Sequence, residues 1–75
     1  MGKFSERLRE LRQSKGLSQN ALAKALGISS RNYQRYEYGE IDAPVSALVA
    51  AMNFFGVSAD YLVGRTNEPV VLRGA

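Results

Sequence analysis

The chain has 75 residues, of which 45% are hydrophobic and 23% are charged, and its formal net charge is +3. This length fits one small domain, and the composition is ordinary for a folded soluble protein. Cysteine and histidine are both absent, which excludes disulfides and thiolate metal sites and removes the usual general base and the commonest metal ligand. We therefore expect no enzyme activity, no cofactor and no metal site.

The placement of charge indicates a polyanionic partner. Residues 1–40 carry eight basic against four acidic residues, a net charge of +4, whereas residues 41–75 carry two against three, a net charge of −1. The N-terminal sequence MGKFSERLRELR is too charged for a signal peptide, and no apolar run approaches the roughly 20 residues that cross a bilayer. We expect a cytoplasmic protein with no membrane partner.

Five segments with helical periodicity each precede a glycine, the residue that most easily ends a helix in the left-handed conformation. These glycines are Gly16, Gly27, Gly39, Gly56 and Gly64. The first helix is expected over about residues 4–14, where Phe4, Leu8 and Leu11 form one apolar stripe. The pattern predicts an all-α fold of five helices.

The second and third helices form the most informative part of the chain. Ser18 and Ser29 are good N-caps for helices that end near residues 26 and 38. Gly27 lies between them, where the chain must turn sharply. A helix, a tight turn and a second helix with a polar outward face are the elements needed to place a helix in a DNA groove.

The sequence also predicts a fourth and a fifth helix. Pro44 fits the first turn of a fourth helix. The apolar residues on one face of that helix are Val45, Leu48, Val49, Met52 and Phe55. Ser58 caps a short fifth helix, with Asp60 near its positive end. Residues 65–75 form a tail that resembles the start of a linker, and for its apolar run at 70–72 disorder is favoured over a partner strand, with a dimer contact left open.

Three segments carry a family resemblance: RLRELRQSKGLSQNALAKALGIS, YQRYEYG and GVSADYLVG. With a small Ala23, the turn Gly27 and the Tyr-Glu-x-Gly that ends at Gly39, they resemble the Xre or Cro/phage-repressor class of helix-turn-helix DNA-binding domains over about residues 4–64. The resemblance implies a five-helix lambda-repressor-like DNA-binding domain over residues 1–64 and a C-terminal tail over residues 65–75. It also implies a homodimer on roughly palindromic double-stranded DNA, with the third helix in the major groove.

The resemblance assigns roles to polar side chains of the two central helices. The residues expected to face base edges are Ser30, Arg31, Gln34 and Arg35. The residues expected to contact phosphates are Gln19, Ser29, Asn32, Tyr33 and Tyr38. Periodicity alone favours an ordinary polar helix surface, but the turn pattern around Ala23 and Gly27 favours DNA contact, since arginine pairs with guanine and glutamine with adenine.

Other charged residues have structural interpretations. Glu37 lies in the last turn of the third helix, where a carboxylate opposes the helix dipole and needs a cationic partner. The family pattern supplies an arginine on the first helix, here Arg12, so we expect a structural salt bridge between them. For Arg7 and Arg9 we favour a solvated helix face over a DNA role.

Four positions depart from the family pattern. Tyr33 replaces the usual Ile or Val, and we expect its ring in the core and its hydroxyl at a phosphate. Glu40 and Asp42 lie in a loop that is often basic, so they weaken attraction to the DNA backbone. Phe54 is larger than the usual alanine. The residues expected at a dimer interface are Phe54, Val57 and Ala59.

We expect a sequence-specific double-stranded DNA-binding transcriptional regulator, with a repressor acting as a dimer as the favoured form. The alternative is an antitoxin-type or other protein-interaction module on the same fold. Residues 65–75 are the only candidate segment for such a protein partner, and they are few.

Overall fold

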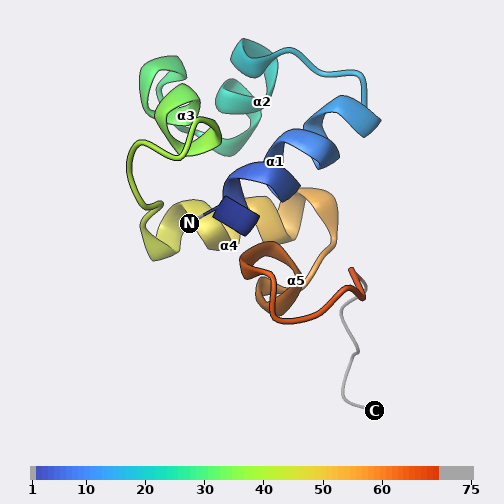
Figure 1. Cartoon of the computed structure of the whole chain (residues 1–75). Coiled ribbons are helices and arrows are strands. Elements are labelled where there is room, and N and C mark those ends of the chain that lie inside the picture. Colours follow the sequence, from blue (N-terminus) through green and yellow to red (C-terminus); the bar gives the residue numbers. More distant parts are fainter. Residues whose placement is uncertain (1, 70–75) are drawn as a thin grey trace.

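A computed structural model of the chain describes residues 2–69. Its helices are α1 (Gly2–Ser14), α2 (Gln19–Leu26), α3 (Ser30–Glu37), α4 (Val45–Phe55) and α5 (Ala59–Val63). Figure 1 shows α1 crossing the middle of the domain, with α2 and α3 on one side and α4 and α5 on the other. The all-α, five-helix fold expected from the sequence is confirmed, and no helix within residues 2–69 is long and apolar enough to cross a membrane.

The helix boundaries follow from local capping chemistry. Ser18, Ser29 and Ser58 are the N-caps of α2, α3 and α5, and each side-chain oxygen accepts a hydrogen bond from the backbone N–H three residues later. These bonds satisfy N–H groups that have no partner inside the helix. Pro44 is the N-cap of α4 itself rather than a residue of its first turn, so that expected boundary was one residue early.

The turn between α2 and α3 depends on Gly27. Its φ of 71° lies in the left-handed region, where a side chain would be strained. The backbone N–H groups of Gly27 and Ile28 donate to carbonyl oxygens in the last turn of α2, and this closes the helix before the chain enters α3. Ala23 is 1% exposed, and its small side chain allows the close approach of the two helices.

One core joins all five helices. Its buried apolar residues are Phe4, Leu8, Leu22, Ala23, Tyr33, Tyr36, Ala47, Ala51, Val57 and Leu62. Helix α1 packs against α3 and α5, α2 packs against α3 and α4, and α4 packs against α5. The hydroxyl of Ser5 adds a buried hydrogen bond of 2.7 Å to the carbonyl oxygen of Tyr36, which ties α1 to the last turn of α3.

Helix α4 turns a different face to the core than the apolar stripe predicted. Ala47 and Ala51 are its buried residues, whereas Val45 and Val49 are 74% and 43% exposed. Leu48, Met52 and Phe55 pack at the edge of the core. Helix α4 is apolar on nearly all sides, so no polar face could be recognised in its sequence. In the structure, small side chains face the core where α4 lies against α2 and α5.

Arg7 corrects a second expectation, because it is buried rather than part of a solvated face. Its guanidinium carbon lies 4.1 Å from the centre of the Tyr61 ring. One terminal nitrogen donates to the carbonyl oxygens of Tyr61 at 2.7 Å and Thr66 at 2.6 Å, and the other donates to Oδ1 of Asn67 at 2.8 Å. Arg9, by contrast, is exposed as expected.

The segment that follows α5 is held against the domain as far as it is described. Besides the bonds to Arg7, the N–H of Arg65 donates to the carbonyl oxygen of Asp60, and the N–H of Ser58 donates to that of Pro69. The expected boundary after residue 64 stays a prediction. The apolar run at 70–72 lies outside the described residues.

Candidate nucleic-acid interface

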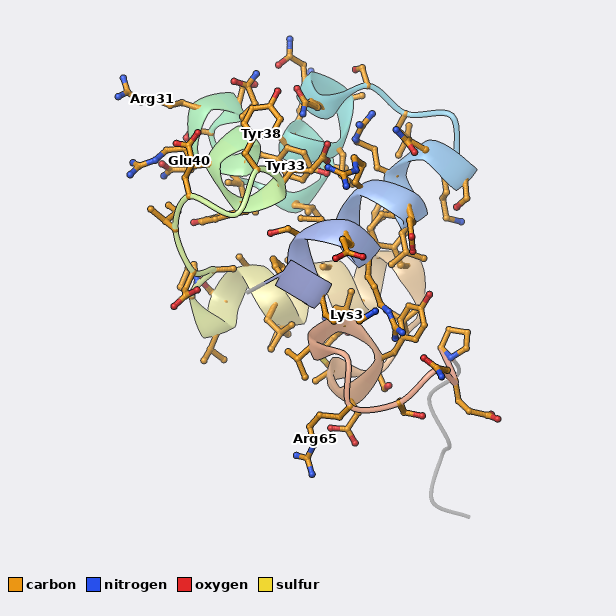
Figure 2. All side chains as sticks on the ribbon, viewed as in Figure 1. Lys3, Arg31, Tyr33, Tyr38, Glu40 and Arg65 are labelled. Carbon is orange, nitrogen blue, oxygen red and sulfur yellow. The ribbon has the colours of Figure 1, made fainter. Side chains whose placement is uncertain are left out.

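The side chains expected to face base edges lie together on α3. Ser30 and Arg31 are exposed, and Gln34 and Arg35 are half-exposed. In Figure 2, Arg31 extends away from the domain, whereas Arg65 lies at the opposite end of the molecule. Helix α3 therefore presents a continuous row of hydrogen-bonding groups to solvent, and contact of these groups with bases stays a prediction.

The opposite face of α3 is deeply buried. Tyr33 is fully buried, Tyr36 is 6% exposed and Glu37 is 1% exposed. The helix is thus fixed by contacts on one side and free on the other, which is the arrangement required of a rigid reading element.

At the start of α3, Ser29 and Asn32 are both exposed. The Oγ atom of Ser29 accepts a hydrogen bond from the N–H of Asn32 at 3.1 Å. This cap uses one lone pair of the hydroxyl and leaves its hydrogen able to donate to another acceptor. The proposed phosphate contacts of both residues are compatible with these positions.

Tyr33 is where the structure overturns a predicted phosphate contact. The ring lies in the core as expected, but the side chain is 0% exposed and its hydroxyl donates to Oε2 of Glu37. Burial, together with the adjacent carboxylate, raises the pKa of the Tyr33 hydroxyl. A hydroxyl that is enclosed and already donates cannot reach a phosphate, so Tyr33 is a structural residue.

The predicted ion pair between Arg12 and Glu37 is present. Nε of Arg12 donates to Oε2 and Nη2 donates to Oε1, both at 2.9 Å, and Nη1 donates to the carbonyl oxygen of Leu17 at 2.8 Å. This two-point geometry is the strongest form of an arginine–carboxylate contact. It links α1, the turn before α2, and the end of α3.

Glu37 keeps its charge although it is buried. Burial alone raises the pKa of a carboxyl group, but hydrogen bonds from Arg12, Tyr33 and Gln19 outweigh that effect and hold the pKa of Glu37 below its ordinary value. The same ion pair raises the pKa of Arg12. The buried group is therefore a carboxylate at neutral pH.

Gln19 and Tyr38 join this network from the surface side. Nε2 of Gln19, the first residue of α2, lies 3.1 Å from Oε1 of Glu37 and 3.5 Å from the hydroxyl oxygen of Tyr38. Tyr38 is the C-cap of α3 and is 59% exposed. Figure 2 shows Tyr38 and Tyr33 on the same part of the domain, and of the two only Tyr38 is exposed.

The acidic loop after α3 lies close to the exposed polar face of α3. Oε1 of Glu40 lies 3.8 Å from Nε of Arg35, and both side chains are substantially exposed. Figure 2 shows Glu40 on the same side of the domain as Arg31. An exposed pair at this distance contributes little to stability. The carboxylate of Glu40 nevertheless lies beside Arg35, a side chain that we expect to contact DNA.

The expected dimer interface is partly corrected. Val57 is 4% exposed and belongs to the core, so it is not available to a second subunit. Phe54 is 40% exposed and makes an edge-on contact with Phe55, their ring centres 5.0 Å apart. Ala59 is half-buried. The burial of Val57 was not predicted, because a single valine after a helix shows no periodicity from which burial can be inferred.

Within residues 2–69 there is no group of three or more acidic side chains that could hold a metal ion. A hollow of about 340 Å³ lies between the α2–α3 turn and the start of α4. Its lining includes Leu26, Ile28, Tyr36 and Pro44, with no carboxylate or basic side chain.

Comparison with known proteins agrees with this geometry. A family model described as a helix-turn-helix domain matches residues 3–62. The SPbeta prophage-derived HTH-type transcriptional regulator YonR of Bacillus subtilis (strain 168) is 41% identical over 64 residues, which cover 85% of this chain and 59% of YonR. No solved structure gives a significant match.

Two further regulators of the same organism are similar. YqaE is 40% identical over 68 residues, covering 89% of this chain and 59% of YqaE. ImmR is 37% identical over 62 residues, covering 83% of this chain and 49% of ImmR. Both are HTH-type transcriptional regulators by name, and the matched part spans between about half and three fifths of these relatives.

Proposed function

This chain belongs to the helix-turn-helix domain family, and we propose that it is a sequence-specific double-stranded DNA-binding transcriptional regulator. The observation that carries the proposal is the division of α3 into two faces. Tyr33, Tyr36 and Glu37 anchor one face in the core, and the other presents polar side chains to solvent. Packing of a core does not require such a row of polar side chains, whereas the recognition of base edges in the major groove does.

Within this proposal, Ser30, Arg31 and Gln34 face base edges, and Arg35 contacts a base or a neighbouring phosphate. Ser29 and Asn32 contact phosphates at the start of the helix. Phosphate contacts supply much of the affinity and make it fall as salt rises. The buried pair of Arg12 and Glu37 holds α3 against α1, so that the reading side chains are presented from a rigid support.

We further propose that the protein binds a roughly palindromic operator as a dimer and acts as a repressor. Two copies of α3 spaced about 34 Å apart, one turn of DNA, would read two half-sites. Phe54 and Ala59 are the residues of the earlier interface prediction that remain accessible, and Phe54 is one of the few large exposed apolar side chains among the described residues.

Selection of bound sites from a randomised duplex library at near-physiological salt tests the function. The proposal predicts an enriched palindrome whose half-sites are about one DNA turn apart. An enriched site without symmetry would support base reading and contradict the dimer. General, salt-sensitive binding without enrichment would contradict sequence-specific recognition.

A further inference from the structure

The buried carboxylate of Glu37 dictates how the amide of Gln19 is oriented. A carboxylate only accepts hydrogen bonds, and the atom of Gln19 that lies 3.1 Å from Oε1 of Glu37 is Nε2. The reverse orientation would set the amide oxygen against a charged oxygen. The NH2 group of Gln19 therefore faces inward, toward a group that is 1% exposed.

This orientation leaves the side chain of Gln19 without a free donor for DNA. An amide NH2 group has two hydrogens. One is directed to Glu37, and the other to the hydroxyl oxygen of Tyr38, 3.5 Å away. The remaining polar atom of the side chain is the carbonyl oxygen, which accepts hydrogen bonds and would repel a phosphate oxygen.

The contact with Gln19 leaves the hydroxyl hydrogen of Tyr38 able to donate to another group. Because the Tyr38 oxygen accepts from Gln19, its own hydrogen must point away from Gln19. Tyr38 is 59% exposed at the end of α3, so that hydrogen is directed to solvent. An exposed O–H donor of this kind is suited to a phosphate oxygen.

We propose that Tyr38 is the side chain that donates to a DNA phosphate at this end of α3, and that Gln19 is a positioning residue whose side chain acts through Tyr38 without contacting DNA. This inference rests on the proposed DNA-binding function. It reassigns the side chain of Gln19, which the family resemblance placed among the phosphate contacts. It also connects the buried carboxylate of Glu37 through Gln19 to Tyr38 in two hydrogen bonds.

A double-mutant cycle tests the inference. The probe is a mixed-sequence duplex labelled with fluorescein, which suffices because phosphate contacts do not depend on sequence. The dissociation constants of the full chain are measured for Tyr38→Phe, Gln19→Met and the double variant, at a temperature where circular dichroism shows each one folded. Tyr61→Phe, on α5, is the matched control.

We expect Tyr38→Phe to weaken binding by about fivefold, which corresponds to one hydrogen bond of about 1 kcal/mol. Gln19→Met should weaken binding less, and it should add nothing in the Tyr38→Phe background. An equal loss from Gln19→Met in both backgrounds would overturn the positioning role, and an unchanged affinity of Tyr38→Phe would overturn the phosphate contact. Failure of the unmodified chain to bind the duplex at low salt would instead contradict the proposed function itself.

Discussion

The hydroxyl of Tyr33 donates a hydrogen bond to the carboxylate of Glu37 one turn later on α3, and both side chains are almost fully buried. Tyrosine at this position thus supplies a donor that an aliphatic residue would lack. Together with Arg12 and Gln19, it gives the buried carboxylate donors from α1, α2 and α3. Helix α3 is therefore fixed by a polar contact as well as by apolar packing.

Removal of the Tyr33 hydroxyl should lower stability without a change of fold. Tyr33→Phe keeps the ring in the core but deletes a hydrogen bond to a charged acceptor, at a cost of about 2 kcal/mol in the free energy of unfolding. Urea denaturation measures this loss. Tyr38→Phe, at an exposed position, serves as the control. An equal loss of unfolding free energy for the two substitutions would show that the buried hydrogen bond of Tyr33 contributes no more to stability than an exposed hydroxyl.

Loss of Arg12 should be more severe. Arg12→Ala leaves the charge of Glu37 buried without its main partner, and breaking such a pair costs about 3 kcal/mol or more. Arg9→Ala removes the same charge from an exposed position of the same helix and should change stability by less than about 0.5 kcal/mol. Thermal unfolding of both variants gives the comparison. Equal melting temperatures would refute the role of the pair.

Acid should weaken the domain in a way that depends on Glu37. Its pKa is lower in the folded state than the ordinary value of 4.5, so the folded state favours the charged form. The resulting stability is complete above about pH 4.5 and is lost as the pH falls through the lower folded-state pKa. Glu37→Gln should show a flatter decline of unfolding free energy between neutral pH and pH 3. Parallel curves for the two proteins would contradict the lowered pKa.

Arg7 should hold the segment that follows α5 against the domain. Lysine keeps the charge but cannot reproduce the planar set of donors that reaches Tyr61, Thr66 and Asn67. Arg7→Lys should therefore destabilise this attachment by about 1–2 kcal/mol. Hydrogen exchange provides the measurement, because the N–H of Ser58 is protected by the carbonyl oxygen of Pro69. Exchange at Ser58 should accelerate, and unchanged exchange would show that other contacts hold the segment.

Features governed by local chemistry were predictable from the sequence. Ser18, Ser29 and Ser58 cap helices because their side chains reach backbone groups three residues away. Gly27 ends α2 because its backbone conformation suits glycine. The ion pair of Arg12 and Glu37 came from the family pattern together with the unfavourable position of a carboxylate at a helix end.

Features governed by packing between distant segments were not predictable in the same way. Arg7 looks like one more charged residue of α1, and its partners lie more than fifty residues later. Val45 and Val49 are exposed because α4 turns Ala47 and Ala51 to the core, which its uniformly apolar sequence does not specify. The spacing of four residues between Tyr33 and Glu37 on one helix could have indicated their contact, but the full burial of both side chains depends on packing against the other helices.

The most direct test of DNA recognition by α3 compares Arg31→Ala with Arg65→Ala. Both arginines are exposed, and each substitution removes one positive charge, but Figure 2 shows the two residues at opposite ends of the domain. Affinity is measured for the duplex that the unmodified protein enriches and for a mixed-sequence duplex.

Recognition through α3 predicts that Arg31→Ala weakens binding to the enriched duplex by about tenfold, with a smaller effect on the mixed duplex, while Arg65→Ala changes neither by more than about twofold. Equal losses for the two variants on both duplexes would mean that only net charge matters. That result would contradict the assignment of α3 as the element that reads bases.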